Sequence, residues 1–237
     1  MKKTKSLIRF FVIGCFALMA IGGAAEATPS TQIWNPSTDI QAAGVTHLGI
    51  DNYFTQEGPA QGGYAFPTDL GLTYGVNSNL EVGVDVMAPQ SNPFVFNAKA
   101  ALPENGAIPA LAIGGFGFGT MQGVTDQNVL YALAAKSLII GDKALGRITA
   151  GGYAGNDKVL LDPNGNKDAS GVILTWDKTI NDKLWLCVDY ASGKSALGAT
   201  FYGFSWNFSS NTSVIFGYGT YNNGAKPTYT TQLDINI

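Results

Sequence analysis

Apolar and polar residues alternate strictly over residues 79–87, where the chain reads NLEVGVDVM. Successive side chains of a β-strand point to opposite faces. One face of this strand therefore collects four aliphatic side chains, and the other carries two carboxylates, Glu81 and Asp85. The pattern predicts a strand with one face in an apolar environment and the other in a polar one.

The same alternation recurs along most of the chain in segments of about ten residues separated by turn signals, which is typical of a transmembrane β-barrel. We expect a closed, antiparallel, up-and-down, all-β barrel of about twelve strands. Ten strands remain possible if a weak pair lies outside the sheet. In PALAIGGFGFG the apolar parity switches between Ile113 and Phe116, which predicts a bulge or a glycine kink. The predicted strands begin near residues 39, 62, 78, 92, 108, 127, 144, 170, 181, 195, 211 and 226.

The predicted connections alternate in length. Those at 75–79, 178–183 and 208–213 are short, whereas the intervening ones are longer and richer in glycine or charge. Outer-membrane barrels have short periplasmic turns and longer exterior loops. We therefore expect both termini of the barrel on the periplasmic side.

Charged residues are scarce, at 13% of the chain, against about 25% in an ordinary soluble domain. Alternation alone also allows a soluble periplasmic sandwich or a lipocalin-like barrel, but such a protein needs a charged outer surface. The shortage of charge therefore favours lipid around the barrel, with the carboxylates of residues 79–87 inside. Beyond residue 27 no stretch of about 18 apolar residues predicts a spanning helix.

Residues 1–27 have the basic start, apolar run and small-residue end of a secretory signal peptide. We expect an N-terminal periplasmic segment over 28–38 and the transmembrane barrel over 39–237. A lipidated Cys15 is the alternative to cleavage after Ala27. The remaining 210 residues carry ten basic and sixteen acidic side chains, so no basic patch predicts a nucleic-acid partner. Cys187 is then the only cysteine and cannot form an intramolecular disulfide.

Three stretches, WNPSTDIQAAGVTHLGIDNY, DLGLTYGVNSNLEVGVDV and GFSWNFSSNTSVIFGY, carry a family resemblance. With them the chain resembles Gram-negative outer-membrane β-barrel proteins, either small porin-like barrels or barrels left uncharacterised, over essentially its whole length after residue 27. The resemblance implies location in the bacterial outer membrane, contact with its lipid and lipopolysaccharide, and insertion by the barrel-assembly machinery. Such barrels usually end in Phe, whereas this chain ends in Ile237.

Eight charged side chains fall on the predicted polar face and are candidates for the lumen. They could line an aqueous path and set its selectivity, or they could pair with one another and fill a narrow barrel. The eight are Glu81, Asp85, Lys99, Lys136, Arg147, Asp177, Asp189 and Asp234.

The leading functional hypothesis is a porin-like channel for passive passage of small polar solutes, without catalytic residues, cofactor or metal. One alternative is a non-conducting structural or surface-interaction barrel. The other is a barrel-embedded hydrolase that uses His47, the only histidine, which could meet Asp69 or Asp234 on neighbouring strands. DPNGNKD, over 162–168, resembles a calcium loop but has Lys167 in place of the required glycine, so we expect an exposed turn.

Overall fold

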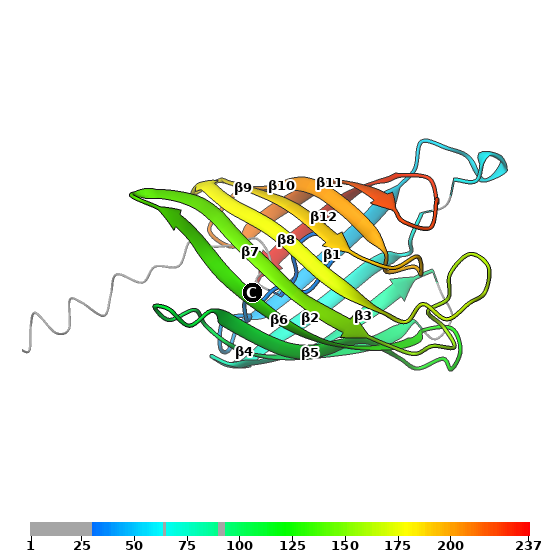
Figure 1. The fold of residues 1–237 in the computed structure, drawn as a ribbon, viewed down its shortest axis with the longest axis horizontal. Helices are drawn as coiled ribbons and strands as arrows, with labels where there is room; N and C mark the ends of the chain where they lie inside the picture. The colour runs from blue at the N-terminus through cyan, green and yellow to red at the C-terminus, as the bar shows by residue number, and fades with distance from the viewer. Residues whose placement is uncertain (1–29, 64, 90–92) are drawn as a thin grey trace, which may run out of the picture.

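A computed structural model describes residues 30–63, 65–89 and 93–237. Its twelve strands form one closed barrel in which every strand pairs antiparallel with its neighbours in sequence, and β1 (Thr46–Phe54) closes the sheet against β12 (Thr228–Asn236). Figure 1 shows the barrel from the side, with strongly tilted strands. The predicted fold class and strand number are confirmed. The predicted signal peptide, over 1–27, lies outside the described residues.

The other elements follow in chain order around the barrel, with a short 3-10 helix between β1 and β2. They are η1 (Pro59–Gln61), β2 (Thr68–Asn77), β3 (Leu80–Ala88), β4 (Phe94–Leu102), β5 (Ala110–Gly119), β6 (Asp126–Ile140), β7 (Lys143–Ala154), β8 (Ser170–Asn181), β9 (Leu184–Ala191), β10 (Ala199–Asn207) and β11 (Thr212–Tyr221).

From β3 onward the predicted strand starts agree with the structure to within four residues. The first two predictions are wrong by more, because β1 begins at Thr46 rather than near Asp39, and β2 begins at Thr68 rather than near 62. Asp39 instead forms an ion pair inside the barrel with Arg147, 2.7 Å away. Before β2, Pro67 has no N–H to donate to the sheet.

The outer surface of the barrel is apolar and the inner surface is largely polar. On β3, Val82 is 42% exposed whereas the neighbouring Glu81 is 3% exposed. The outward side chains include Leu72, Phe96, Ile113, Leu130, Leu174, Tyr202 and Trp206. An apolar belt around a closed sheet fits hydrocarbon, because the sheet satisfies the backbone hydrogen bonds that lipid cannot. No helix among the described residues is long and apolar enough to cross a membrane.

On β6 the side chains face the opposite way from what the predicted lumenal position of Lys136 requires. Val129 and Leu133 point inward and are buried, whereas Leu130 is exposed on the outer face. Lys136 shares the parity of Leu130 and therefore lies outside the lumen, where its ammonium pairs with Glu104 at 2.7 Å. Hydrogen bonds from Lys136 and Ser137 lower the pKa of Glu104, which lies in the β4–β5 turn, to about 2.

The predicted irregularity in β5 is confirmed. The register with β4 shifts between Phe96 and Ala98, and the register with β6 shifts between Phe116 and Phe118. Gly117 has a φ of 70°, a conformation that favours glycine. This bulge keeps Phe116 partly buried against Tyr131 inside the barrel, while Phe118 points outward.

The short turns and the C-terminus share one end of the barrel, and the longer connections share the other (Figure 1). In the β7–β8 connection, Asp162 accepts hydrogen bonds from the backbone of Asn164 and from the backbone and side chain of Asn166. The bonds from Asn166 are the main cause that lowers the pKa of Asp162. The turn therefore uses this carboxylate for its own amides rather than for an ion.

Candidate functional site: a partly filled lumen

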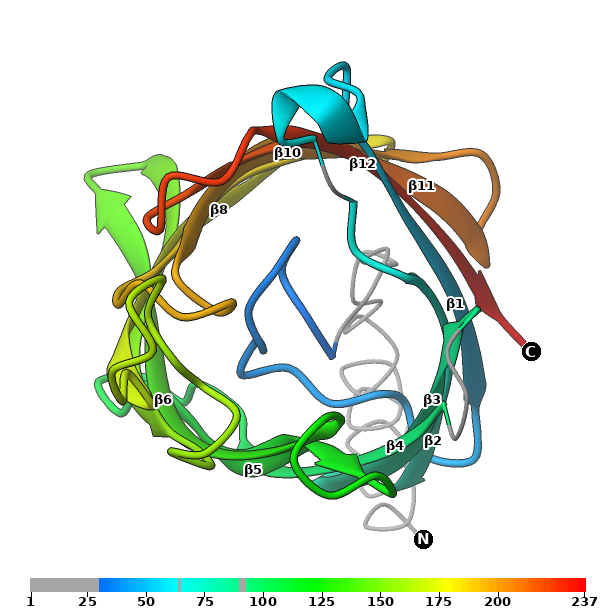
Figure 2. The ribbon, with the colours of Figure 1, turned by 90° about the vertical axis from the view of Figure 1, so that its right-hand side faces the viewer.

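The chain before β1 lies inside the barrel. Figure 2 looks along the barrel and shows residues 30–45, which we call the N-terminal segment, crossing the interior before they join β1. The described part of 28–38 therefore differs from the predicted periplasmic segment. At the short-turn end the segment passes so close to β2 that a Cβ on Gly75 would lie 2.1 Å from the Ala42 carbonyl oxygen. Only glycine allows this approach.

Asp189 on β9 is the main anchor of the segment. It is fully buried, and one of its oxygens accepts backbone N–H bonds from Ile33, Trp34 and Asn35 at 3.2, 2.8 and 2.8 Å. The other oxygen accepts hydrogen bonds from the Asn35 amide and the Thr175 hydroxyl. One carboxylate thus satisfies three consecutive backbone donors, and the segment holds a fixed turn.

A second anchor lies on β3 and β4. Glu81 and Lys99 form a buried ion pair at 3.1 Å. Glu81 also accepts hydrogen bonds from the Ser30 hydroxyl and the Gln41 backbone, and Lys99 donates to the Ser30 carbonyl at 2.8 Å. The pair is therefore saturated by the segment rather than by solvent.

Arg147 on β7 holds the segment from a third side. Its guanidinium contacts Asp39 of the segment at 2.7 Å and Asp177 of β8 at 3.1 Å. Asp177 also accepts hydrogen bonds from Gln32 and from the Trp185 indole. A charge-assisted pair of this kind gains geometric specificity from the guanidinium fork.

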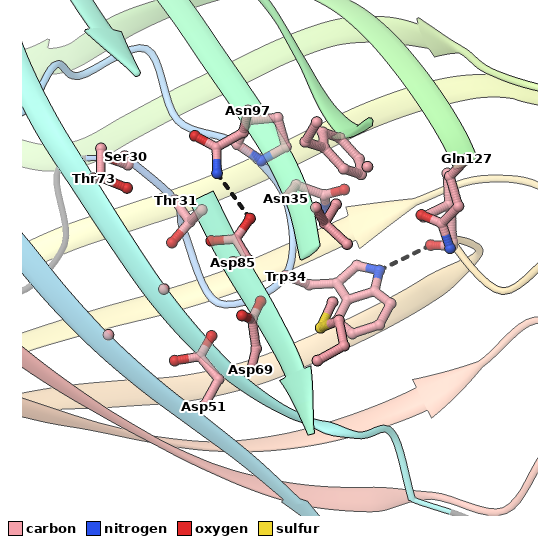
Figure 3. Close-up of a pocket in the computed structure, with 18 of the residues that line it drawn as sticks. Ser30, Thr31, Trp34, Asn35, Asp51, Asp69, Thr73, Asp85, Asn97 and Gln127 are labelled. Carbon is pink, nitrogen blue, oxygen red and sulfur yellow. Dashed lines mark hydrogen bonds between the residues drawn. The ribbon is translucent and has the colours of Figure 1, made fainter. Parts of the chain in front are cut away.

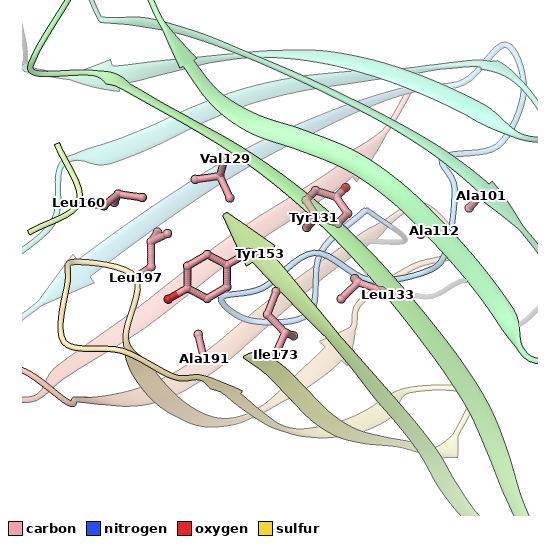
Figure 4. Packing of buried hydrophobic residues seen from close by; sticks show 10 residues of the cluster. All are labelled: Ala101, Ala112, Val129, Tyr131, Leu133, Tyr153, Leu160, Ile173, Ala191 and Leu197. Atoms are coloured by element: carbon pink, nitrogen blue, oxygen red, sulfur yellow. The ribbon is translucent and has the colours of Figure 1, made fainter. Parts of the chain in front are cut away.

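Apolar packing completes the attachment of the segment. The inner wall of β5–β8 carries a cluster of buried side chains that includes Val129, Tyr131, Leu133 and Ile173 (Figure 4), against which Trp34 and Ile40 of the segment pack. Trp34 also stacks on Phe201, with ring centroids 4.9 Å apart, and donates to the Leu197 carbonyl. The segment covers this apolar wall, which explains why β6 turns its Val and Leu side chains inward.

A cavity of about 460 Å³ remains beside the segment. Its far wall is the inner face of β1–β4, from which Asp51, Asp69 and Asp85 point into it (Figure 3), and Trp34 and Asn35 line the segment side. Asp85 accepts a hydrogen bond from Asn97 at 2.8 Å. The open part of the described lumen is therefore acidic on one side and bordered by the segment on the other.

Two glycines leave room in the acidic wall. Gly49 on β1 and Gly71 on β2 lie directly opposite each other and both line the cavity. A Cβ added at Gly71 would lie 2.9 Å from an Asp85 oxygen. The Asp85 side chain therefore extends across Gly71, and a larger residue there would displace it.

The eight predicted lumen residues fall into three groups. Lys136 lies outside the lumen. Six are joined by ion pairs or hydrogen bonds inside the barrel. Asp85 lines the cavity and accepts one hydrogen bond, from Asn97. The six are Glu81, Lys99, Arg147, Asp177, Asp189 and Asp234.

The sequence reasoning missed Asp51 and Asp69 as lumen candidates. Both share the inward parity of their strands, and that signal was sufficient to find them. It missed Trp34 as well, since nothing in the alternation places residues before β1.

His47 meets Asp234, one of its two predicted partners, at 3.2 Å, and its other ring nitrogen lies 3.1 Å from Asn236. Ser213 contacts Asp234, not the imidazole. A hydrolytic triad requires the histidine between the nucleophile and the carboxylate, whereas here the carboxylate lies between serine and histidine. Among the described residues no group of three His, Cys, Asp or Glu side chains could hold a metal.

Comparison of the sequence with family models and with curated proteins gives no match. Among solved structures, the KdgM porin is similar with a TM-score of 0.52 at 8% identity, over 80% of this chain and 98% of that one. An outer membrane channel from Pseudomonas putida F1 is similar with a TM-score of 0.44 at 12% identity, over 83% of this chain and 96% of that one. The Acinetobacter baumannii outer membrane protein Omp33 is similar with a TM-score of 0.44 at 10% identity, over 81% of this chain and 96% of that one.

Of these three structures, the KdgM porin alone has a TM-score above 0.5, and at 8% identity the similarity concerns the fold. Together with the apolar outer belt, it defines the chain as a membrane-spanning β-barrel with the fold of that porin.

Proposed function

We propose that the barrel is a narrow, permanently restricted channel for passive passage of small polar solutes. The cavity between the N-terminal segment and β1–β4 supports this proposal most directly, because its β1–β4 wall carries Asp51, Asp69 and Asp85 and its glycines leave it unfilled. The segment occupies much of the interior and is bonded on three sides, so solutes pass beside it rather than after its removal. Lipopolysaccharide around the apolar belt and insertion by the barrel-assembly machinery belong to the same proposal.

A non-conducting barrel is the second candidate. The saturated ion pairs of Glu81 with Lys99 and of Arg147 with Asp177 favour it, since they fill the lumen on the side of the segment. A His47 hydrolase is disfavoured, because His47 is buried and Ser213 does not contact it.

Single-channel recording of the purified barrel in planar bilayers distinguishes these candidates. The channel proposal expects small, discrete and stable conductance steps in KCl from a barrel whose migration on an unboiled gel shows that it is folded. A folded barrel that leaves the bilayer sealed would refute the proposal and favour the non-conducting candidate.

Gly71→Leu tests where the path runs. The leucine would displace the Asp85 side chain and occupy the cavity, so we expect a conductance well below that of the wild type. Leu72→Val, one residue away on the outer face, is the matched control and should conduct like the wild type. Equal conductance of all three proteins would show that solutes do not pass along this wall.

A further inference from the structure

The acidic wall of the cavity contains a costly arrangement. Asp51 on β1 and Asp69 on β2 are direct cross-strand partners on the inner face. Like charges placed opposite each other on a sheet destabilise it. Neither carboxylate has an ion-pair partner among the described residues, and one oxygen of Asp69 is inaccessible to solvent and without a hydrogen-bond partner.

These two residues contrast with the other lumenal acids. Glu81 and Asp177 each face a lysine or arginine at 3.1 Å, Asp234 contacts the His47 imidazole at 3.2 Å, and Asp189 is saturated by donors. Among the described residues, Lys99 is the only lysine or arginine that lines the cavity, and it is already engaged by Glu81. A positively charged ligand in the cavity would supply the charge that the described residues do not place beside this pair.

Three aromatic side chains also line the cavity. Trp34, Tyr53 and Phe66 line it together with the two aspartates, and their rings contact one another with centroids 5.1 to 5.9 Å apart. Aromatic faces attract cations, by up to about 2 kcal/mol where water is excluded. Carboxylates beside aromatic rings suit a positive charge that carries an apolar shell, whereas an anion would meet repulsion.

We propose that this cavity binds small organic cations of the quaternary ammonium type, with the cationic head near Asp51 and Asp69 and methyl groups against Trp34, Tyr53 and Phe66. The volume of about 460 Å³ lies in the range of small-molecule sites, about 300 to 1,000 Å³. As the solute class of the channel, these cations rest on the proposed function, although binding itself requires only the cavity.

Isothermal titration calorimetry of the folded barrel in detergent at pH 8 tests this proposal with choline as the probe. The control ligand is 3,3-dimethylbutan-1-ol, which has the shape of choline without its charge. We expect choline to bind at least about tenfold more tightly than the neutral alcohol, which corresponds to about 1.4 kcal/mol. Equal affinities, or no binding of choline, would overturn the proposal.

Two variants locate the site. Asp51→Asn with Asp69→Asn should weaken choline binding at least about tenfold and leave the alcohol unaffected, whereas Asp182→Asn in the exposed β8–β9 turn should bind like the wild type. If the double variant does not fold, Phe66→Leu, which lies outside the strands, replaces it and should weaken choline alone. Unchanged choline affinity in the folded variant would refute the site.

The choline-binding test and the conductance test can fail independently of each other. Conductance without choline binding would overturn the cation site and leave the channel standing. Choline binding by a barrel that leaves the bilayer sealed would do the reverse.

Discussion

Asp189→Ala should produce a barrel with a markedly larger single-channel conductance than the wild type. The substitution removes the acceptor of three backbone N–H groups in the N-terminal segment and of the Asn35 amide. A buried donor left without a partner costs about 1–3 kcal/mol, so the segment loses its main attachment and leaves the lumen. A wider aqueous cross-section then conducts more ions.

Two further variants and a protease assay test whether the N-terminal segment restricts the conductance. Deletion of residues 30–41 should raise the conductance at least as much, because it removes the segment and leaves β1 intact. Asp182→Ala, in the exposed β8–β9 turn, should not change it. Chymotrypsin should cleave after Trp34 faster in Asp189→Ala than in the wild type. Wild-type conductance in the deletion variant would mean that the segment does not restrict the path.

Val84→Arg should destabilise the barrel in lipid by about 2–4 kcal/mol, the cost of a cation at the bilayer midplane. Val84 lies between Leu72 and Phe96 on the neighbouring strands, and both of these are exposed on the outer face. Urea titration of the barrel in lipid vesicles, followed by tryptophan fluorescence, measures the free energy of unfolding.

The control is the same substitution near the end of a strand. Ile180 is exposed one residue before β8 ends, and an arginine at the interface costs only about 0–1 kcal/mol. Equal losses at the two positions would indicate that depth in a bilayer does not matter, and a tolerated Val84→Arg would indicate that this face is not in hydrocarbon.

The alternation from β8 to β12 predicted those strands well, because their outward residues are apolar and their inward residues are mostly polar or small, apart from buried side chains such as Ile173, Phe201 and Ile215. In β8, Thr175 and Asp177 point inward, whereas Val172 and Leu174 point outward. On such strands the alternation of polar and apolar residues correctly predicts which side chains point into the lumen.

The same reasoning failed on β6, where both faces are apolar. Val129 and Tyr131 cover part of the lumen because the N-terminal segment packs there, and Leu130 and Ala132 face outward. Nothing in residues 126–140 reveals this, since the cause is the distant packing of Trp34 and Ile40. For that reason the alternation wrongly predicts that Lys136 faces the lumen.

The N-terminal segment itself could not be predicted from alternation. WNPST, over 34–38, reads as a turn-rich linker, and its backbone donors find their acceptor on β9, more than 150 residues away. By contrast, the acidic wall was predictable, since Asp51 and Asp69 alternate with aliphatic residues just as Glu81 and Asp85 do.

Water and the N-terminal segment occupy the inside of the barrel while lipid covers the outside, and two adjacent residues of β2 test this arrangement. Thr73 lines the cavity and Leu72 is exposed on the outer face. Each is changed to cysteine with Cys187→Ser, and the barrels are treated in lipid vesicles with a water-soluble, membrane-impermeant methanethiosulfonate. We expect the reagent to modify Thr73→Cys and to leave Leu72→Cys unmodified. Modification of Leu72→Cys with Thr73→Cys protected would contradict it.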